Sequence, residues 1–439
     1  MSDLSPPGRR WEVAAPAPES LREALPDVHP VVLQVLYTRG LTSAAAVRAF
    51  LDGDGIALHD PRLLHGMDRA VSRLRRALLA GESVAVHGDF DVDGVTGVAI
   101  LVNGLRAAGG RVIPVLPLRT AVGYGLLAET VERLATQGVS VIVTADTGTR
   151  ATAAVQRAAQ VGVDVIVTDH HLPGEELPPA LAVVNPHQAD CTYPFKELAG
   201  AGVAWKVVHA LALEGLVPQA VADDLLDLVA LGTIVDVAPL WGENRLLVQR
   251  GLRRLATSLR PGLRALCSGT GGAVDERTVA FSIGPRLNAA GRMDDPQLAL
   301  ELLLTESSQR AAELVALLEG KNAERQRLTE AVLQQARAQA AEMDDDPVLV
   351  LRGNGWAGGV IGLVASRIAE ECGRPAFVVD VGAELCRGSG RSSGGIDLVA
   401  LLTGCADLLI EFGGHTQAAG FAARAEHLDA VTQRLIDLA

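Results

Sequence analysis

Apolar residues come in short, nearly continuous runs that alternate with amphipathic stretches between about residue 67 and residue 184. Such runs are typical of strands buried on both faces, and the amphipathic stretches have the period of helices. The alternation predicts an α/β fold built on a doubly wound parallel sheet. The predicted strands are Ser83–His87, Arg111–Leu116, Ser140–Ala145, Asp164–Thr168 and Ala182–Val184, and the predicted helices are Met67–Ala80, Val95–Ala108, Leu126–Gln137 and Arg150–Val161.

From about residue 198 to residue 342 the pattern becomes almost wholly helical. It ends in a long charged stretch without proline, SSQRAAELVALLEGKNAERQRLTEAVLQQARAQAAEM, which is typical of a helix that bridges two domains. A second α/β pattern follows this helix. We therefore expect a partly helical N-terminal lead over 1–60, an α/β domain with a helical insert over 61–305, a connecting helix over 306–345 and a smaller α/β domain over 346–439.

The composition is that of an ordinary globular protein, with 49% hydrophobic and 21% charged residues. The net charge of −13 argues against a basic coat that binds polyanions generally, although a local basic pocket remains compatible with it. The five cysteines show no CxxC spacing, which is neither a disulfide framework nor a zinc site. The N-terminus lacks an apolar signal region, and no apolar run reaches the length of a membrane span. We expect a cytoplasmic protein without membrane contact.

Acidic residues follow several of the predicted strands. Asp91 and Asp93 come after the first strand, Asp146 follows SVIVTA, and an Asp-His-His run starts at Asp169. A lone aspartate after a strand is commonly a helix N-cap. Several clusters at the carboxyl ends of parallel strands converge on one edge of the sheet, however, where α/β proteins bind ligands. A further acid, Asp236, lies in an apolar setting. Clustered carboxylates need cations, and the mixture with imidazole favours Mn²⁺ over Mg²⁺.

The motifs HGDFDVDGVTG, VTADTGT, VTDHHLP and LGTIVDVAPL resemble, in this order, the motifs of the DHH phosphoesterase superfamily. GWAGGVIGLVASRI, GSGRSSGGIDL and FGGHTQAAGF resemble the DHHA1 domain that follows in that superfamily. Within it, the chain is most similar to the RecJ-type single-stranded-DNA exonucleases. The resemblance covers almost the whole chain and implies a DHH catalytic domain followed by a DHHA1 domain.

This resemblance also implies a two-metal centre, with Mn²⁺ as the preferred ion and Mg²⁺ as a weaker substitute. Asp146 would bridge the ions, and Asp89 would give supporting or alternative ligation in catalysis. His171 would be a catalytic contact to the scissile phosphate. The remaining implied ligands are His87 and Asp91 for one ion, and Asp93, His170 and Asp236 for the other.

The residues implied in substrate binding lie mostly in the second half of the chain. Five match positions associated with a pocket for a 5′ phosphate: Arg119, Ser389, Arg391, Gly414 and His415. Three more in GPRLNAAGR look like groups that contact the DNA strand, with a helix-capping loop as the alternative: Arg286, Asn288 and Arg292.

The chain departs from the family pattern in three places. Thr147 stands where Asn or Cys is usual, and Ala357 replaces the histidine of GWHxGVIG. Longer members of the family carry an OB-fold beyond the position of Ala439, and the acidic net charge leads us to expect a chain without such a DNA-binding module.

The leading hypothesis is a Mn²⁺-dependent 5′→3′ exonuclease that releases 5′ mononucleotides from single-stranded DNA in repair or recombination. Its substrate would carry a 5′ phosphate, and a single-strand-binding protein or a helicase is a candidate partner. One alternative is a phosphodiesterase for short oligonucleotides or cyclic dinucleotides. Another is a non-catalytic scaffold of DNA replication, which would have lost metal ligands that are all present here.

Overall fold

The computed structural model describes residues 12–53, 56–117, 125–269, 273–293, 295–343, 346–392 and 395–439. The chain forms two compact units. The first comprises residues 1–86, 100–113 and 128–257, and the second comprises residues 87–99, 114–127 and 258–439. The division passes through a strand and the following helix, so the first acidic cluster is counted with the second unit. Within the described ranges, no helix combines the length and apolar character needed to cross a membrane.

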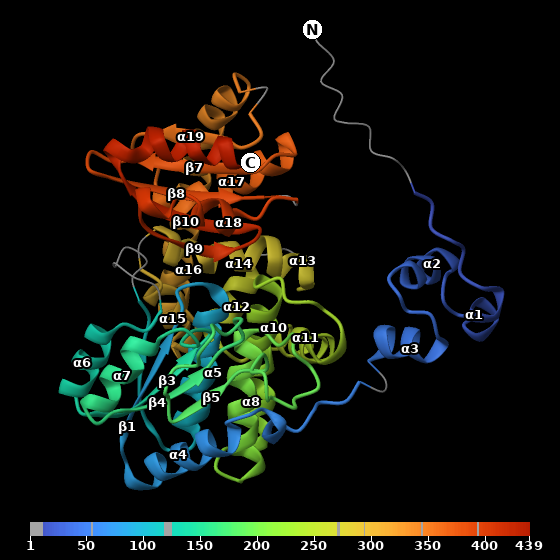
Figure 1. The fold of residues 1–439 in the computed structure, drawn as a ribbon. Coiled ribbons are helices and arrows are strands. Elements are labelled where there is room, and N and C mark those ends of the chain that lie inside the picture. The colour runs from blue at the N-terminus through green and yellow to red at the C-terminus, as the bar shows by residue number, and fades with distance from the viewer. Residues whose placement is uncertain are drawn as a thin grey trace. The chain divides into compact units, whose positions relative to one another are not determined.

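Three short helices near the N-terminus, all in the first unit, pack on a small core of their own (Figure 1). They are α1 (Glu19–Ala24), α2 (Pro30–Thr38) and α3 (Ala44–Asp52). The side chain of Ser43 caps α3, as short polar residues before a helix commonly do, and the ring of His29 accepts from the first turn of α2. The core consists of Leu21, Leu25, Leu33, Leu36 and Val47.

The predicted parallel sheet is present in the first unit. Its strands run in the order β2-β1-β3-β4-β5. Because β2 lies on one side of β1 and the later strands lie on the other, the strand order reverses between β1 and β3. This is the point of a doubly wound sheet at which ligands bind, beyond the carboxyl ends of the strands. The strands are β1 (Ser83–Gly88), β2 (Arg111–Val115), β3 (Val139–Ala145), β4 (Asp164–Thr168) and β5 (Ala182–Val184).

Helices cover both faces of this sheet. Helices α4 (Met67–Ala80) and α8 (Gly200–Leu213) pack against each other on one face, and α6 (Ala128–Thr136) and α7 (Thr152–Gln160) do so on the other (Figure 1). The sheet is therefore buried from both sides, which explains the continuous apolar runs of its strands. The remaining helices of the unit are α9 (Gln219–Asp224), α10 (Leu226–Val235) and α11 (Gly242–Leu255).

Helix α5 (Val92–Ala107) begins earlier than the predicted Val95. The carboxylate of Asp91 accepts hydrogen bonds from the backbone N–H groups of Asp93 (3.0 Å) and Gly94 (3.1 Å). Capping by Asp91 satisfies these donors and lets the helix start within the acidic motif itself. Asp93 therefore lies in the first helical turn.

The second unit combines a helical part with a five-stranded mixed sheet of order β6-β7-β8-β10-β9. Strands β6 and β7 are parallel, and the other neighbouring strands are antiparallel. Its helices are α12 (Pro261–Ser268), α13 (Glu276–Thr278), α14 (Gly284–Met293), α15 (Gln297–Leu304), α16 (Ser308–Ala340), α17 (Gly358–Cys372), α18 (Leu398–Thr403) and α19 (Leu428–Leu438). Its strands are β6 (Leu349–Gly353), β7 (Ala376–Val381), β8 (Leu385–Arg391), β9 (Leu409–His415) and β10 (Ala418–Arg424).

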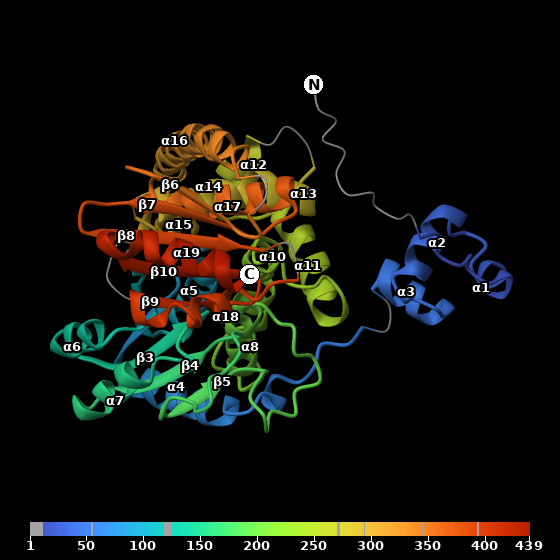
Figure 2. The ribbon, with the colours of Figure 1, turned by 45° about the horizontal axis from the view of Figure 1, so that its top comes forward.

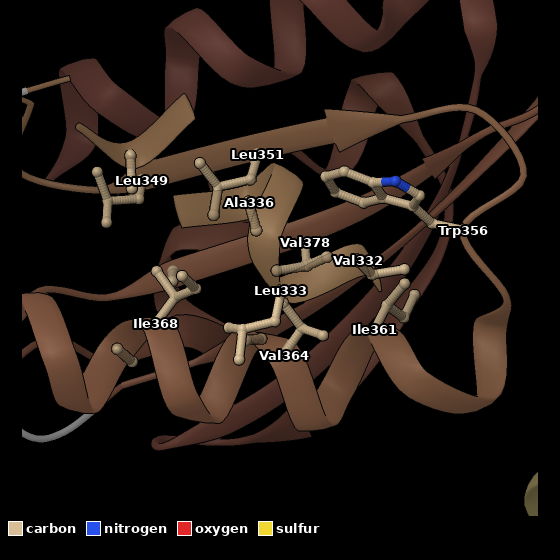
Figure 3. Packing of buried hydrophobic residues seen from close by; sticks show 14 of the residues in the cluster. Val332, Leu333, Ala336, Leu349, Leu351, Trp356, Ile361, Val364, Ile368 and Val378 are labelled. Carbon is tan, nitrogen blue, oxygen red and sulfur yellow. The ribbon is translucent and has the colours of Figure 1, made fainter. Parts of the chain in front are cut away.

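The long helix α16 is present as predicted, with buried residues in both halves, and its C-terminal half packs on the second sheet. Helices α16 and α17 cover one face of the second sheet, while α18 and α19 contribute to the core on the other (Figure 2). Figure 3 shows the first of these cores, where Leu333 of α16 lies fully buried beside Val364 of α17. Truncating Leu333 to alanine would cost about 2–5 kcal/mol. Further members of this core are Val332, Ala336, Leu349, Leu351, Trp356, Ile361, Ile368 and Val378.

Candidate functional site

Asp146 occupies a strained position directly after β3. Its backbone is left-handed, with φ of 59°, which is uncommon for any residue other than glycine and is tolerated best by asparagine and aspartate. Its N–H donates to the carbonyl of Thr168 at 3.1 Å, and its side chain is only 3% exposed. A Cβ atom at Gly200 would lie 2.6 Å from the Cβ of Asp146, so only glycine fits against this side chain. The hydrogen bond to Thr168 fixes the backbone of Asp146, and Gly200 leaves room for its carboxylate.

The two histidines after β4 lie next to Asp146. Nε2 of His170 is 3.0 Å and Nδ1 of His171 is 3.7 Å from Oδ1 of Asp146. One potential ligand atom from each of the three residues lies within 4.8 Å of the others. Three residues predicted from two separate strands thus come together and could hold a metal ion.

Asp169 orients these histidines from a buried position. Its Oδ1 accepts from the N–H of His170 (2.8 Å) and lies 2.8 Å from Nδ1 of His171, and its Oδ2 accepts from the N–H of Thr149 (2.9 Å). Burial by itself raises the pKa of Asp169. The hydrogen bond and positive charge of His171, together with the hydrogen bonds from Thr149, outweigh burial and lower the pKa of Asp169 to about 2. An ionised Asp169 requires the proton of His171 on Nδ1, which leaves Nε2 for another partner.

His170 is uncharged at neutral pH. Burial, reinforced by the neighbouring His171, lowers the pKa of His170 to about 4. The backbone of Leu198 also hydrogen-bonds the His170 ring. A neutral imidazole held by a backbone carbonyl is the form in which histidine binds metals.

Asp236 joins this group from a distant helix. It is the C-cap of α10, and Val237 after it has a left-handed backbone with φ of 60°. Its Oδ2 lies 3.9 Å from Nε2 of His170. A β-branched residue with positive φ is a genuine outlier, and such strain is concentrated at functional positions. The first unit therefore brings together four of the predicted site residues.

The acidic motif after β1 is compact, and this follows from its glycines. A Cβ at Gly94 would lie 2.6 Å from the backbone nitrogen of Asp89, so the turn closes only with glycine there. Asp89 and Asp93 are each 1% exposed, and Asp89 accepts from the N–H of Phe90 at 2.7 Å. His87, also 1% exposed, lies at the end of β1, the neighbour of β3 in the sheet.

The donor set of these residues suits a divalent metal. Carboxylates buried to this degree are costly without a compensating cation. Oxygen and imidazole donors together are typical of Mn²⁺ and related ions. The residues present therefore fit a metal centre.

The structure describes four of the five predicted phosphate-binding residues, and Arg119 lies outside the described residues. Nη1 of Arg391 donates to Oγ of Ser389 (3.1 Å), and a Cβ at Gly362 of α17 would lie 3.1 Å from both side chains. On β10, Ala418 pairs with Arg391 on one side and with His415 on the other. Directly paired residues face the same side of a sheet, so Ser389, Arg391 and His415 share one face.

Gly414 adopts a φ of 143°, where a Cβ would meet the carbonyl oxygen of Ala418 at 2.3 Å. The glycine before His415 is therefore required by the backbone. This requirement explains the glycine in the GGH motif without any ligand.

The three residues predicted to contact the DNA strand lie on α14. Oδ1 of Asn288 accepts from the N–H of Val92 at 3.1 Å, which ties this helix to the acidic motif. Arg286 is largely buried and donates to Oγ of Ser282 (3.0 Å). The backbone of Arg292 packs closely on Gly359, because a Cβ at Gly359 would lie 2.1 Å from the carbonyl oxygen of Arg292. Asn288 and Arg286 thus have structural contacts of their own.

The two substituted positions, Thr147 and Ala357, have plain structural settings. Thr147 is buried, and its carbonyl accepts from Oγ1 of Thr144 at 2.6 Å. Ala357 is the N-cap of α17 and gives no side-chain hydrogen bond to it.

Sequence reasoning placed Asp169 in one of the acidic clusters without giving it a role, and it did not consider Asn185. Asn185 is fully buried after β5, and its amide donates to the carbonyl of His171 (2.8 Å) and to Thr149 (3.0 Å). Both residues contact His171, and neither belongs to the candidate metal-binding groups found among the described residues. The available signal was their position, because each follows a strand at the same edge of the sheet as the predicted ligands.

Comparisons with known proteins agree with this architecture. The model described as "DHH family, N-terminal domain" matches residues 83–233, and that of the "DHHA1 domain" matches residues 345–439. The single-stranded-DNA-specific exonuclease RecJ of Bacillus subtilis is 38% identical over 438 residues, 98% of this chain and 55% of that protein. RecJ of Dickeya dadantii is 40% identical over 446 residues, 94% of this chain and 76% of that protein. The chain spans about half the length of the first relative and three quarters of the second.

Solved structures give the same result. RecJ from Thermus thermophilus in complex with Mn²⁺ has a TM-score of 0.86 at 38% identity, covering 98% of this chain and 62% of that chain. The same protein in complex with Mg²⁺ has a TM-score of 0.78 at 35% identity, covering 98% and 60%.

Proposed function

The chain belongs to the RecJ family, and on this basis we propose that it is a Mn²⁺-dependent exonuclease that degrades single-stranded DNA from the 5′ end to 5′ mononucleotides. The observation that carries the proposal is the cluster of Asp146, His170 and His171 at the carboxyl ends of β3 and β4. It is supported by relatives whose names specify single-stranded DNA and whose structures are bound to manganese.

In this proposal the ligands form two sets that share Asp146. His87 and Asp91 belong to the first set, Asp89 supports or replaces one of them, and Asp93, His170 and Asp236 belong to the second. Bound divalent ions would supply a hydroxide nucleophile at neutral pH and offset the charge that develops on the phosphate. The preference for Mn²⁺ over Mg²⁺ rests on the imidazole ligands.

His171 is assigned to the scissile phosphate. Asp169 holds Nδ1 of its ring, so Nε2 is the atom left to face the substrate. A histidine fixed in this way places its Nε2 without a further entropic cost when the substrate binds. The chain itself thus orients one contact to the reacting group.

The second unit would select the 5′ end of the DNA strand. Arg391 and His415 on one face of the sheet, with Ser389, would bind a 5′ phosphate, which carries more charge than an internal diester. Gly414 would shape this pocket, and Arg119 would complete it. Three residues of α14 would contact the rest of the DNA strand: Arg286, Asn288 and Arg292.

The test uses single strands labelled at either end and incubated with Mn²⁺. 5′ mononucleotides are expected as products from the start of the reaction. The variant Asp146→Asn should abolish these products, and it keeps the left-handed backbone because asparagine tolerates that conformation. A phosphodiesterase restricted to very short substrates would leave long strands intact. A non-catalytic scaffold would bind strands without product, and either result would refute the proposal.

A further inference from the structure

Four buried side chains that are not metal ligands lie close to the candidate centre within the first unit. Lys206 and Asn244 are fully buried, and Glu243 and Tyr193 are each 1% exposed. Lys206 lies on α8, and Glu243 and Asn244 lie in the first turn of α11. We call these four residues the buried brace.

An ion pair forms the middle of the brace. Nζ of Lys206 lies 2.5 Å from Oε1 of Glu243, whose Oε2 accepts from the hydroxyl of Tyr193 at 2.5 Å. The backbone of His59 closes the pair, because its carbonyl accepts from Lys206 (2.9 Å) and its N–H donates to Glu243 (2.9 Å). Burial lowers the pKa of Lys206, and the charge of Glu243 opposes that shift. A buried pair of this kind is a weak source of net stability, but separating its partners leaves an uncompensated buried charge, which opposes movement of α8 away from α11.

One end of the brace reaches Asp146 and His170 through residues 193–200. Tyr193 anchors the start of this segment to Glu243. The backbone of Leu198 hydrogen-bonds the His170 ring, and Gly200 packs directly against the side chain of Asp146. A shift of the segment would therefore move both candidate ligands.

The other end reaches the loop that carries Asp236. Nδ2 of Asn244 donates to the carbonyl of Glu197 at 2.5 Å and to that of Pro239 at 3.2 Å. Glu197 belongs to the segment beside Asp146, and Pro239 follows Asp236. A single amide thus joins the segment that contacts Asp146 and His170 to the loop that carries Asp236.

From this geometry we infer that the brace consists of positioning residues, which set the spacing between Asp236 and the pair of Asp146 and His170 and thereby the affinity for the metal. The inference rests on the metal centre of the proposed function and adds residues that do not touch the metal. Groups that orient metal ligands commonly contribute roughly 10–100-fold to metal affinity.

The experiment measures Mn²⁺ binding to the full chain by calorimetry, without DNA. Asn244→Ala should weaken the Kd for Mn²⁺ by about tenfold, and Tyr193→Phe, which removes one hydroxyl, should weaken it less. Saturating Mn²⁺ should restore most of kcat in both variants. Gln339→Ala is the matched control, because it removes an amide that bridges a helix to the backbone of Arg352 in the second unit. Its Kd for Mn²⁺ should equal that of the unaltered chain.

Melting of the metal-free variants separates positioning from folding. If Asn244→Ala melts earlier but binds Mn²⁺ with unchanged Kd, the brace is structural only and the inference is wrong. If Asn244→Ala does not fold, Tyr193→Phe decides in the same way, since an unchanged Kd there overturns the inference. If the unaltered chain binds no Mn²⁺, the proposed metal centre itself fails, and the inference fails with it.

Discussion

The carboxylate of Asp169 lies 2.8 Å from Nδ1 of His171, two residues further along the chain. The Asp169 side chain is 2% exposed, whereas the His171 side chain is 37% exposed. The pair therefore links a buried charge to a ring at the surface. Because the carboxylate accepts from the ring, the protonation state of one residue determines the tautomer of the other.

Replacing Asp169 with asparagine should reduce the exonuclease rate by at least about tenfold. The amide retains only one acceptor oxygen, whereas the carboxylate accepts from His170, His171 and Thr149. NMR of the His171 ring nitrogens should show a changed tautomer. A variant with normal rate and tautomer would show that Asp169 does not orient His171.

Asp169 should also make stability depend on pH. Its folded pKa of about 2 lies below the ordinary value of 3.8, so its contribution is fully present above pH 4 and is lost as the pH falls through 2. The contribution is about 2 kcal/mol. Urea unfolding of the metal-free chain and of Asp169→Asn should give free energies that differ most above pH 4 and converge near pH 2. A difference independent of pH would contradict the assignment.

Gly200→Ala should impair metal binding in a folded protein. The new methyl group would lie 2.6–2.9 Å from three side-chain atoms of Asp146, so the carboxylate must move. We expect a loss of activity of more than about tenfold. Gly202→Ala in the same helix is the control, because the three atoms nearest to its Cβ all belong to the side chain of Leu198, at 3.3 Å or more. Equal activity of the two variants would refute the role of Gly200.

Arg391→Ala should remove the preference for a 5′ phosphate. The guanidinium is the charged group beside Ser389, and a terminal phosphate gains more from it than an internal diester does. The measurement is the ratio of initial rates on 5′-phosphorylated and 5′-hydroxyl strands. Arg387→Ala is the control, because Arg387 lies on the same strand and pairs with Glu411. A ratio that changes equally in both variants would place the pocket elsewhere.

Activity should be high with Mn²⁺, lower with Mg²⁺ and absent in chelator. Mg²⁺ binds imidazole poorly and prefers oxygen ligands in octahedral geometry. Rates with each ion alone test this order. Equal or better activity with Ca²⁺ than with Mn²⁺ would contradict the proposed ligand set.

The local pattern along the chain was sufficient for the fold. Helix Met67–Ala80 and strands Asp164–Thr168 and Ala182–Val184 have the predicted limits, because period and burial are local properties. The start of α5 was missed because Asp91 acts as its cap, and the sequence offered Asp89, Asp91 and Asp93 as equally plausible capping residues.

The candidate ligands were also visible in the sequence, since parallel strands bring their carboxyl ends to one edge. The sequence by itself thus determined the fold class, the family and the residue types of the site. Only the tertiary structure decided which groups position the candidate ligands. Asn244 bridges Glu197 and Pro239, and Gly200 packs on Asp146, through contacts between residues far apart in the chain. Such contacts leave no periodic or compositional signal, because they depend on how whole helices pack.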